Sequence, residues 1–355
     1  MFYSLISYNV FYGIQISKDT FFASITILFI IFVDKYLYSQ EIKNTIALII
    51  LGIAFSLGRK NGFYQIAATI ILIIPFIKRL NIRKLLIVGI FITFISYVIF
   101  NQGYRILFNQ LNKGYAFSNR DEVYYNDKGE KLGVSVGNNL IPLQQLSFII
   151  YKDRPLTEYQ RFLLEKLAPL DMIKEAYYPE GYLPVGTVVG RYGDPSFYDV
   201  DKLEYTKIYL QLLKKYPFDF IESYFTMTGI YYSPEVKVIP YGFGIYKNDY
   251  GINNETIISK EYTCFVESLY LSQVDIPILR LLLRPGCITF LLLFAMAFFI
   301  KIKDYNKLIV FIPLLMNIAI LLVATPTAEF RYYYPVAACL PIIIALLLNK
   351  EESIS

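Results

Sequence analysis

Three short polar clusters lie among long apolar runs, and they hold the side chains that could do chemistry. The clusters are Lys18-Asp19, Arg59-Lys60-Asn61 and Glu329-Phe330-Arg331-Tyr332. A charged side chain at the centre of a bilayer costs roughly 3 kcal/mol on insertion scales. We therefore expect each cluster to lie at a membrane face or to line a wet cavity.

The first two clusters combine an acid with cations that suit phosphate. Asp19, held at an interface and partly desolvated, is suited to general-base catalysis or metal binding, unless it only caps the helix that begins FFASITILF. Arg59, Lys60 and Asn61 precede Gly62, which permits close backbone approach. Arginine recognises phosphate in a bidentate manner and lysine acts as a point charge. The alternative is that these cations reach for lipid headgroups.

Two further groups are candidates for ligand contacts. Arg331 either forms a structural ion pair with Glu329, or contacts an anionic ligand while Glu329 orients it, with Tyr332 in the same segment. Gln144 and Gln145 in the segment IPLQQL could bind sugar hydroxyls, because an amide both donates and accepts hydrogen bonds. The alternative for the two glutamines is a solvated helix face.

The composition predicts a membrane protein. Of 355 residues, 55% are hydrophobic and only 18% are charged, whereas soluble domains carry about 25% charged residues. The chain has no histidine, which excludes histidine-based catalysis and histidine metal sites. Its three cysteines show no metal-type spacing, and no basic block with interleaved aromatics argues for nucleic acid. We predict no metal site, and leave the cofactor open, with a divalent cation allowed.

Seven apolar runs predict about seven transmembrane helices in an all-α polytopic protein. Several runs are shorter than the ~20 residues that a spanning helix needs, so we expect the helices to extend beyond them. The runs are Phe21–Val33, Thr45–Leu57, Phe63–Ile77, Leu85–Phe100, Cys287–Ile300, Leu308–Ala324 and Tyr334–Leu348.

The basic residues predict the orientation of these helices. Short loops rich in lysine and arginine lie on the cytoplasmic side. One set of short loops is basic and holds Lys35, Lys43, Lys78, Arg79, Arg83, Lys84, Lys301, Lys303 and Lys307, with Lys350 in the tail. The other set of short loops holds only Lys18, Arg59, Lys60 and Arg331. This places the amino terminus outside and the carboxyl terminus in the cytoplasm, and all three polar clusters then share the outer face.

Three regions follow from this topology: amino-terminal membrane helices over 1–100, an extracytoplasmic domain over 101–283, and carboxy-terminal membrane helices over 284–355. The middle region should be mostly helical. Thr157 with Gln160 matches a capping box, and Leu203, Ile208 and Leu212 suit a buried helical stripe. An amphipathic stretch over 262–283 is expected to lead back to the membrane.

The segments SKDTFFA, LGRKNGFY, IPLQQL and AEFRYYYPV together resemble the polytopic glycosyltransferases of the GT-C class, and more narrowly an uncharacterised branch in low-GC Gram-positive bacteria. That class uses polyprenyl-phosphate sugars on the outer membrane face. The resemblance implies that Lys18-Asp19 matches the second acidic position of the class and Arg59 the basic position that follows. The class normally has earlier helices carrying the principal acid. The resemblance therefore implies a carboxy-terminal portion of such an enzyme, or a second chain that supplies those helices.

The resemblance implies transfer of a sugar from a polyprenyl-phosphate donor to a cell-surface glycan, glycolipid or protein at the bacterial cell membrane. Asp19 would assist as base or metal ligand, and Arg59, Asn61 and Arg331 would hold the phosphate. One alternative is a polysaccharide polymerase or ligase that uses lipid-pyrophosphate donors without a required acid. Another is a non-catalytic membrane subunit.

Overall fold

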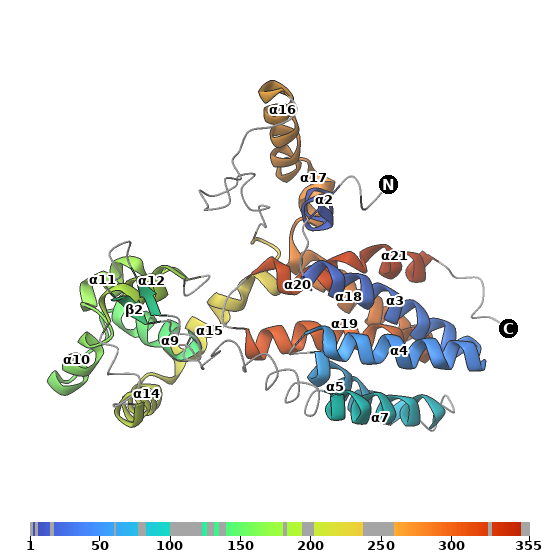
Figure 1. The fold of residues 1–355 in the computed structure, drawn as a ribbon, viewed down its shortest axis with the longest axis horizontal. Coiled ribbons are helices and arrows are strands. Elements are labelled where there is room, and N and C mark those ends of the chain that lie inside the picture. The colour runs from blue at the N-terminus through green and yellow to red at the C-terminus, as the bar shows by residue number, and fades with distance from the viewer. Residues whose placement is uncertain are drawn as a thin grey trace. The chain divides into compact units, whose positions relative to one another are not determined.

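The computed structural model is predominantly helical (Figure 1). Within the described residues its only sheet is one antiparallel pair of short strands. The structure describes residues 3, 6–14, 18–59, 62–76, 83–99, 123–125, 131–134, 140–179, 183–193, 202–236, 259–325 and 329–348.

The chain forms two compact units. The first comprises Met1–Tyr104, Ile230–Leu321 and Glu329–Ser355, and the second comprises Arg105–Gly229 and Leu322–Ala328. The segment 101–283, expected to form one extracytoplasmic domain, thus divides between them near residue 230. The physical reason is that residues after 230 bond to the start of the helix at Pro285. Thr289 Oγ1 donates to the carbonyl of Tyr231 at 2.7 Å, and Arg284 Nη1 donates to that of Pro234 at 2.8 Å.

Helices make up the first unit. They are α2 (Ser7–Ile14), α3 (Lys18–Tyr38), α4 (Ile42–Gly58), α5 (Gly62–Ile73) with the 3-10 turn η1 (Ile74–Phe76), α7 (Arg83–Val98), α16 (Lys260–Leu271), η4 (Ser272–Val274), α17 (Pro277–Leu282), α18 (Pro285–Ile302), α19 (Tyr305–Ala324, mostly in this unit), α20 (Phe330–Ala338) and α21 (Leu340–Leu348).

Four helical segments among the described residues are long and apolar enough to cross a membrane. They are Lys18–Tyr38, Pro285–Ile302, Tyr305–Val323 and Phe330–Leu348, the last formed by α20 and α21 together. The protein is therefore a helical membrane protein. Helices α4, α5 and α7 also cover predicted runs, but with 17, 12 and 16 residues they fall short of spanning length. Four of the seven predicted apolar runs thus lie in helical segments of spanning length.

Local sequence explains where the long carboxy-terminal helices begin and end. Proline at the first position opens α18, where its missing N–H costs no hydrogen bond. Lys303 ends α18 in the left-handed region, with φ of 61°. The carboxylate of Asp304 then accepts a bond from the backbone N–H of Lys307 at 3.2 Å, which starts α19. Two spanning helices are thereby joined by a tight turn.

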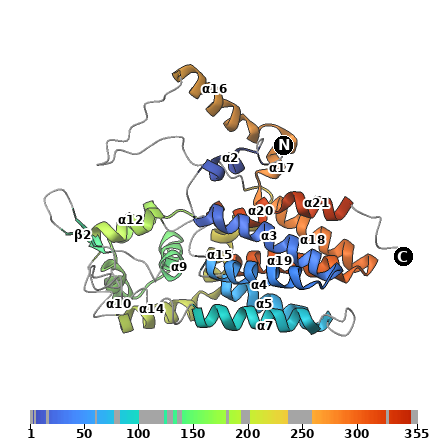
Figure 2. The ribbon, with the colours of Figure 1, turned by 45° about the vertical axis from the view of Figure 1, so that its right-hand side comes forward.

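Helix α3 is the centre of the first unit's packing, with α4 and α20 against it. Figures 1 and 2 show α3 and α4 side by side. The ring of Phe55 lies between Phe22 and Phe29, with centroids 5.0 Å from each. Gly58 allows the close approach, because a Cβ there would lie 2.8 Å from the Phe22 ring. This contact brings the end of α4 to the beginning of α3.

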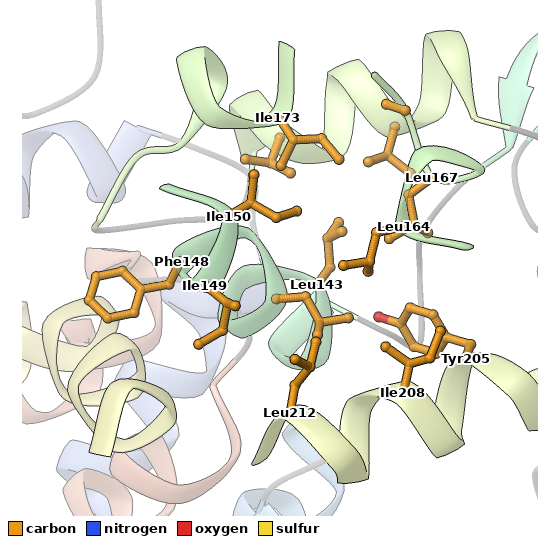
Figure 3. Close-up of a cluster of buried hydrophobic side chains, with 14 of the residues drawn as sticks. Leu143, Phe148, Ile149, Ile150, Leu164, Leu167, Ile173, Tyr205, Ile208 and Leu212 are labelled. Carbon is orange, nitrogen blue, oxygen red and sulfur yellow. The ribbon is translucent and has the colours of Figure 1, made fainter. Parts of the chain in front are cut away.

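The second unit has its own apolar core, shown in Figure 3. Its elements are β1 (Val123–Tyr125), β2 (Lys131–Val134), α9 (Leu140–Tyr151), α10 (Glu158–Glu165), α11 (Leu170–Ala176), α12 (Leu183–Tyr192), α14 (Lys202–Lys215) and α15 (Pro217–Thr228). The two strands pair Val123 with Val134. Leu143 and Ile149 of α9 lie at the centre of the core, against α10, α11 and α14.

Two local predictions for this unit can be checked. The capping box is confirmed, since Thr157 and Gln160 bond reciprocally at the start of α10. The predicted stripe on α14 is wrong at one position. Ile208 and Leu212 are buried, but Leu203 is 67% exposed, and Tyr205 takes the inward position one turn before Ile208.

Candidate functional site

The first pair of the candidate site joins the start of α3 to the end of α4. Asp19 lies in the first turn of α3, and Arg59 follows the last residue of α4. Arg59 Nη2 lies 2.8 Å from Asp19 Oδ1, and the two side chains are only 11% and 6% exposed. The N–H groups are not aligned with this oxygen, which accepts no hydrogen bond from any described residue. The contact is therefore a buried ion pair rather than a well-formed hydrogen bond.

Arg59 also contacts α20, from the other end of the sequence. Its guanidinium carbon lies 4.7 Å from the centroid of the Tyr332 ring, and Nη1 lies 3.5 Å from the Tyr332 carbonyl oxygen. Stacking of a guanidinium on an aromatic face is favourable, and more so when desolvated. Burial lowers the pKa of Arg59, and Asp19 opposes that shift. One cation therefore binds three segments together.

A second ion pair lies on the same ring. Arg331 pairs with Glu329, and its Nη2 donates to the Tyr332 hydroxyl at 3.1 Å. The Arg331 guanidinium carbon lies 4.9 Å from the Tyr332 centroid, so both arginines flank one ring. The Arg331 side chain is 45% exposed, unlike that of Arg59. Burial raises the pKa of Glu329, and Arg331 opposes part of that shift.

Buried hydroxyl groups position this segment. The Tyr231 hydroxyl donates to the carbonyl of Glu329 at 3.2 Å. The Tyr333 hydroxyl donates to the carbonyl of Pro285 at 2.9 Å and lies 2.9 Å from Thr289 Oγ1. The rings of Tyr231 and Tyr333 stack with centroids 6.1 Å apart. The sequence analysis missed Tyr231 and Thr289, because no local pattern marks a tether to a segment so distant in the chain.

The structure thus brings together five of the residues that the sequence analysis names, Asp19, Arg59, Glu329, Arg331 and Tyr332. We call these five residues the charged cluster. Lys18 is exposed at the start of α3, and the ion pairs and ring contacts that join the cluster do not include it. Two further predicted residues, Lys60 and Asn61, lie outside the described residues.

The predicted acceptor contacts have a structural role instead. Gln144 and Gln145 are 0% and 9% exposed, inside the second unit rather than on a solvated face. Gln144 Nε2 donates to the carbonyl of Tyr178 at 2.6 Å, and Gln145 Nε2 donates to that of Phe220 at 3.1 Å. Gln145 Oε1 also accepts from the Tyr209 hydroxyl at 2.6 Å. A buried amide must bond to buried partners, so we no longer expect these residues to contact an acceptor.

No group of three or more cysteine, aspartate or glutamate side chains within the described part of the chain could hold a metal ion. The first unit does contain a small apolar recess between α3, α4, α5, α7 and α19. Its lining includes Leu48, Ile66 and Ile92, with Thr69 as its one polar side chain, and none of the charged cluster. The recess therefore suits hydrocarbon rather than a sugar or a phosphate.

Comparison with known proteins adds a family but no activity. Neither the curated proteins nor the solved structures contain a match to this chain. One protein family matches residues 1–354, nearly the entire sequence. The chain therefore belongs to DUF6020, a family of unknown function.

Proposed function

We propose that the protein is a membrane glycosyltransferase that moves a sugar from a polyprenyl-phosphate donor to a cell-surface glycan, glycolipid or protein. In this proposal the fold is GT-C-like, about seven helices cross the bacterial cell membrane, and the charged cluster faces outward. The amino terminus lies outside and the carboxyl terminus in the cytoplasm. The observation that carries the proposal is the charged cluster itself, assembled from α3, α4 and α20 in an otherwise apolar helical unit.

The charged cluster places two arginines and two carboxylates at helix ends, and such a site suits an anionic ligand. Arg331 is the accessible cation, and its present partner is Glu329. A phosphate can replace the Glu329 carboxylate on Arg331, because arginine donates hydrogen bonds to either group in the same bidentate geometry. The Tyr332 ring holds both guanidinium groups within 5 Å of its centroid, so Arg59 adds positive charge behind Arg331. Fixed positive charge of this kind stabilises a phosphate leaving group.

The two carboxylates differ in how free they are to accept a proton from an acceptor hydroxyl. Asp19 is 4% exposed and held by Arg59, so we assign it to positioning that arginine. Glu329 has a pKa raised by burial, which brings it closer to the range useful for a general base. Displacement from Arg331 by a phosphate would free this carboxylate at the moment when a base is needed.

One observation favours a second candidate function. The four charges of the cluster pair one to one, which is also what a purely structural clamp requires. A non-catalytic membrane subunit would need no more than this.

A polymerase or ligase that uses lipid-pyrophosphate donors would use the same cations without a base. It should therefore tolerate Glu329→Gln.

Binding of polyprenyl phosphate to the protein in nanodiscs tests the proposal. We expect Arg331→Gln to weaken binding at least tenfold. Lys43→Gln is the matched control, because Lys43 is an exposed cation in the first turn of α4, at the opposite end from Arg59. Equal binding by both variants and the wild type, or no binding by the wild type, would contradict the proposed phosphate site.

A further inference from the structure

An exposed apolar stripe follows helix α16 of the first unit. Tyr262, Phe265, Val266 and Leu269 have the spacing i, i+3, i+4, i+7 that places them on one face. Tyr262, Phe265 and Leu269 are 53%, 61% and 52% exposed, and Val266 is partly exposed. On a helix that faces water such a stripe would be unfavourable, because removing apolar surface from water lowers the free energy.

The stripe continues into the next helix. Ile278 and Leu281 of α17, one turn apart, are 73% and 51% exposed, and Ile276 just before them is 46% exposed. In the described structure α16 packs chiefly against η4, η4 against α17, and α17 against α18. Figures 1 and 2 both show α16 extending beyond α17. Packing among the described residues therefore leaves this face uncovered.

The opposite face of α16 carries polar side chains up to Ser268, with exposed Leu271 at the end of the helix. Glu261, Cys264 and Ser268 are exposed there, and Lys260 begins the helix. Exposed Arg280 adds a cation on α17. A helix with one apolar aromatic face, one polar face and flanking cations is typical of segments that lie in the plane of a membrane interface.

The position of α16 and α17 in the chain indicates what covers their apolar stripe. Only Leu283 and Arg284 separate α17 from α18, and α18 is long and apolar enough to span a membrane. The segment is thus tied to the point where the chain enters the bilayer. We infer that α16 and α17 form an interfacial anchor, with the apolar stripe inserted at the headgroup–acyl boundary of the membrane lipids. This anchor requires only that the chain is a membrane protein, and is independent of the glycosyltransferase proposal.

The absence of tryptophan from the sequence gives a direct test. A single tryptophan is introduced by Phe265→Trp on the stripe, or by Ser268→Trp on the polar face as the matched control. Leu269→Trp is a second stripe variant in case the first fails to fold. Each full-length protein is reconstituted in vesicles of phosphatidylcholine and phosphatidylglycerol, with or without bromine on the acyl chains near the headgroup.

We expect brominated lipid to quench the stripe tryptophans at least threefold more strongly than the polar-face tryptophan. In the same vesicles Cys264 should react with a water-soluble maleimide, with Cys264→Ser as the blank. Equal quenching on both faces would overturn the inference. So would a blue-shifted but unquenched stripe tryptophan, because that result would show that protein, such as a second copy of this chain, covers the stripe.

Discussion

The ion pair between Asp19 and Arg59 should contribute to stability as a coupled pair. Removing one partner of a buried ion pair leaves an uncompensated charge and typically costs about 3–5 kcal/mol of stability. Both residues keep a second source of support. Arg59 retains the Tyr332 ring and carbonyl, and Asp19 retains the amino end of the α3 dipole. We therefore expect each single variant, Asp19→Asn or Arg59→Gln, to lose about 3 kcal/mol.

The double variant separates the pair's coupling from its separate effects. Because Asn and Gln together leave no buried charge, the double variant should lose about 2 kcal/mol less than the sum of the singles. The assay is equilibrium unfolding in mixed micelles of a mild detergent and dodecyl sulfate, followed by helical circular dichroism. The control cycle uses Glu41 and Lys43, which pair at 2.7 Å but are 55% and 76% exposed. It should show no measurable coupling.

Two outcomes would refute this reasoning. Coupling near zero for Asp19 and Arg59 would mean that water or lipid headgroups screen the pair, contrary to its burial. Equal coupling in the buried and exposed cycles would mean that burial has no part in the effect.

Other predictions concern neighbouring features. Tyr332→Leu should lose about 1–2 kcal/mol in the same unfolding assay, and Tyr332→Phe less, because only leucine removes the face on which two cations stack. Burial raises the pKa of Glu329 above its ordinary 4.5. The protonated Glu329 side chain therefore contributes its full stability below about pH 4.5, and this contribution is lost as the pH rises through the raised pKa. Unfolding free energy should therefore fall more between about pH 4 and pH 7 in the wild type than in Glu329→Gln. Gly62→Ala should destabilise by about 2 kcal/mol or more, since a Cβ there would meet a carbonyl oxygen of α4 at 2.3 Å, whereas Gly229→Ala meets nothing within 4 Å and should not. Gln145→Leu should cost about 1–3 kcal/mol by leaving buried groups unbonded while leaving donor binding unchanged.

The sequence predicts the charged cluster because each of its parts interrupts an apolar run. Asp19, Arg59 and Arg331 each lie at the end of a hydrophobic segment, and we expect the alternation of the predicted helices to place them on one membrane face. The sequence analysis names the pair of Arg331 with Glu329 as one alternative, but it does not pair Asp19 with Arg59. That pair depends on the approach of α3 and α4, and the approach depends on Phe22 packing over Gly58.

Burial is the property that the sequence conveys least well for polar residues. Two adjacent glutamines such as Gln144 and Gln145 can occur on a solvated helix face or in a core. Only their hydrogen bonds to carbonyl groups of distant segments show that they are buried in the second unit. Leu203 is a second example. Its apolar side chain fits the predicted buried stripe, but in the structure it points away from the core and is exposed. Conversely, the exposed stripe of α16 has a sequence pattern typical of a buried face.

The most direct test of the proposed function is release of lipid phosphate from polyprenyl-phosphate sugars by the purified protein in nanodiscs, with and without Mg²⁺ or Mn²⁺. A panel of sugars is supplied with an acceptor mixture from cell-envelope glycans. The proposal predicts release by the wild type, at least a hundredfold slower release by Arg331→Gln and Glu329→Gln, and unchanged release by Lys43→Gln. Absence of release with every donor, or equal rates in all variants, would contradict it.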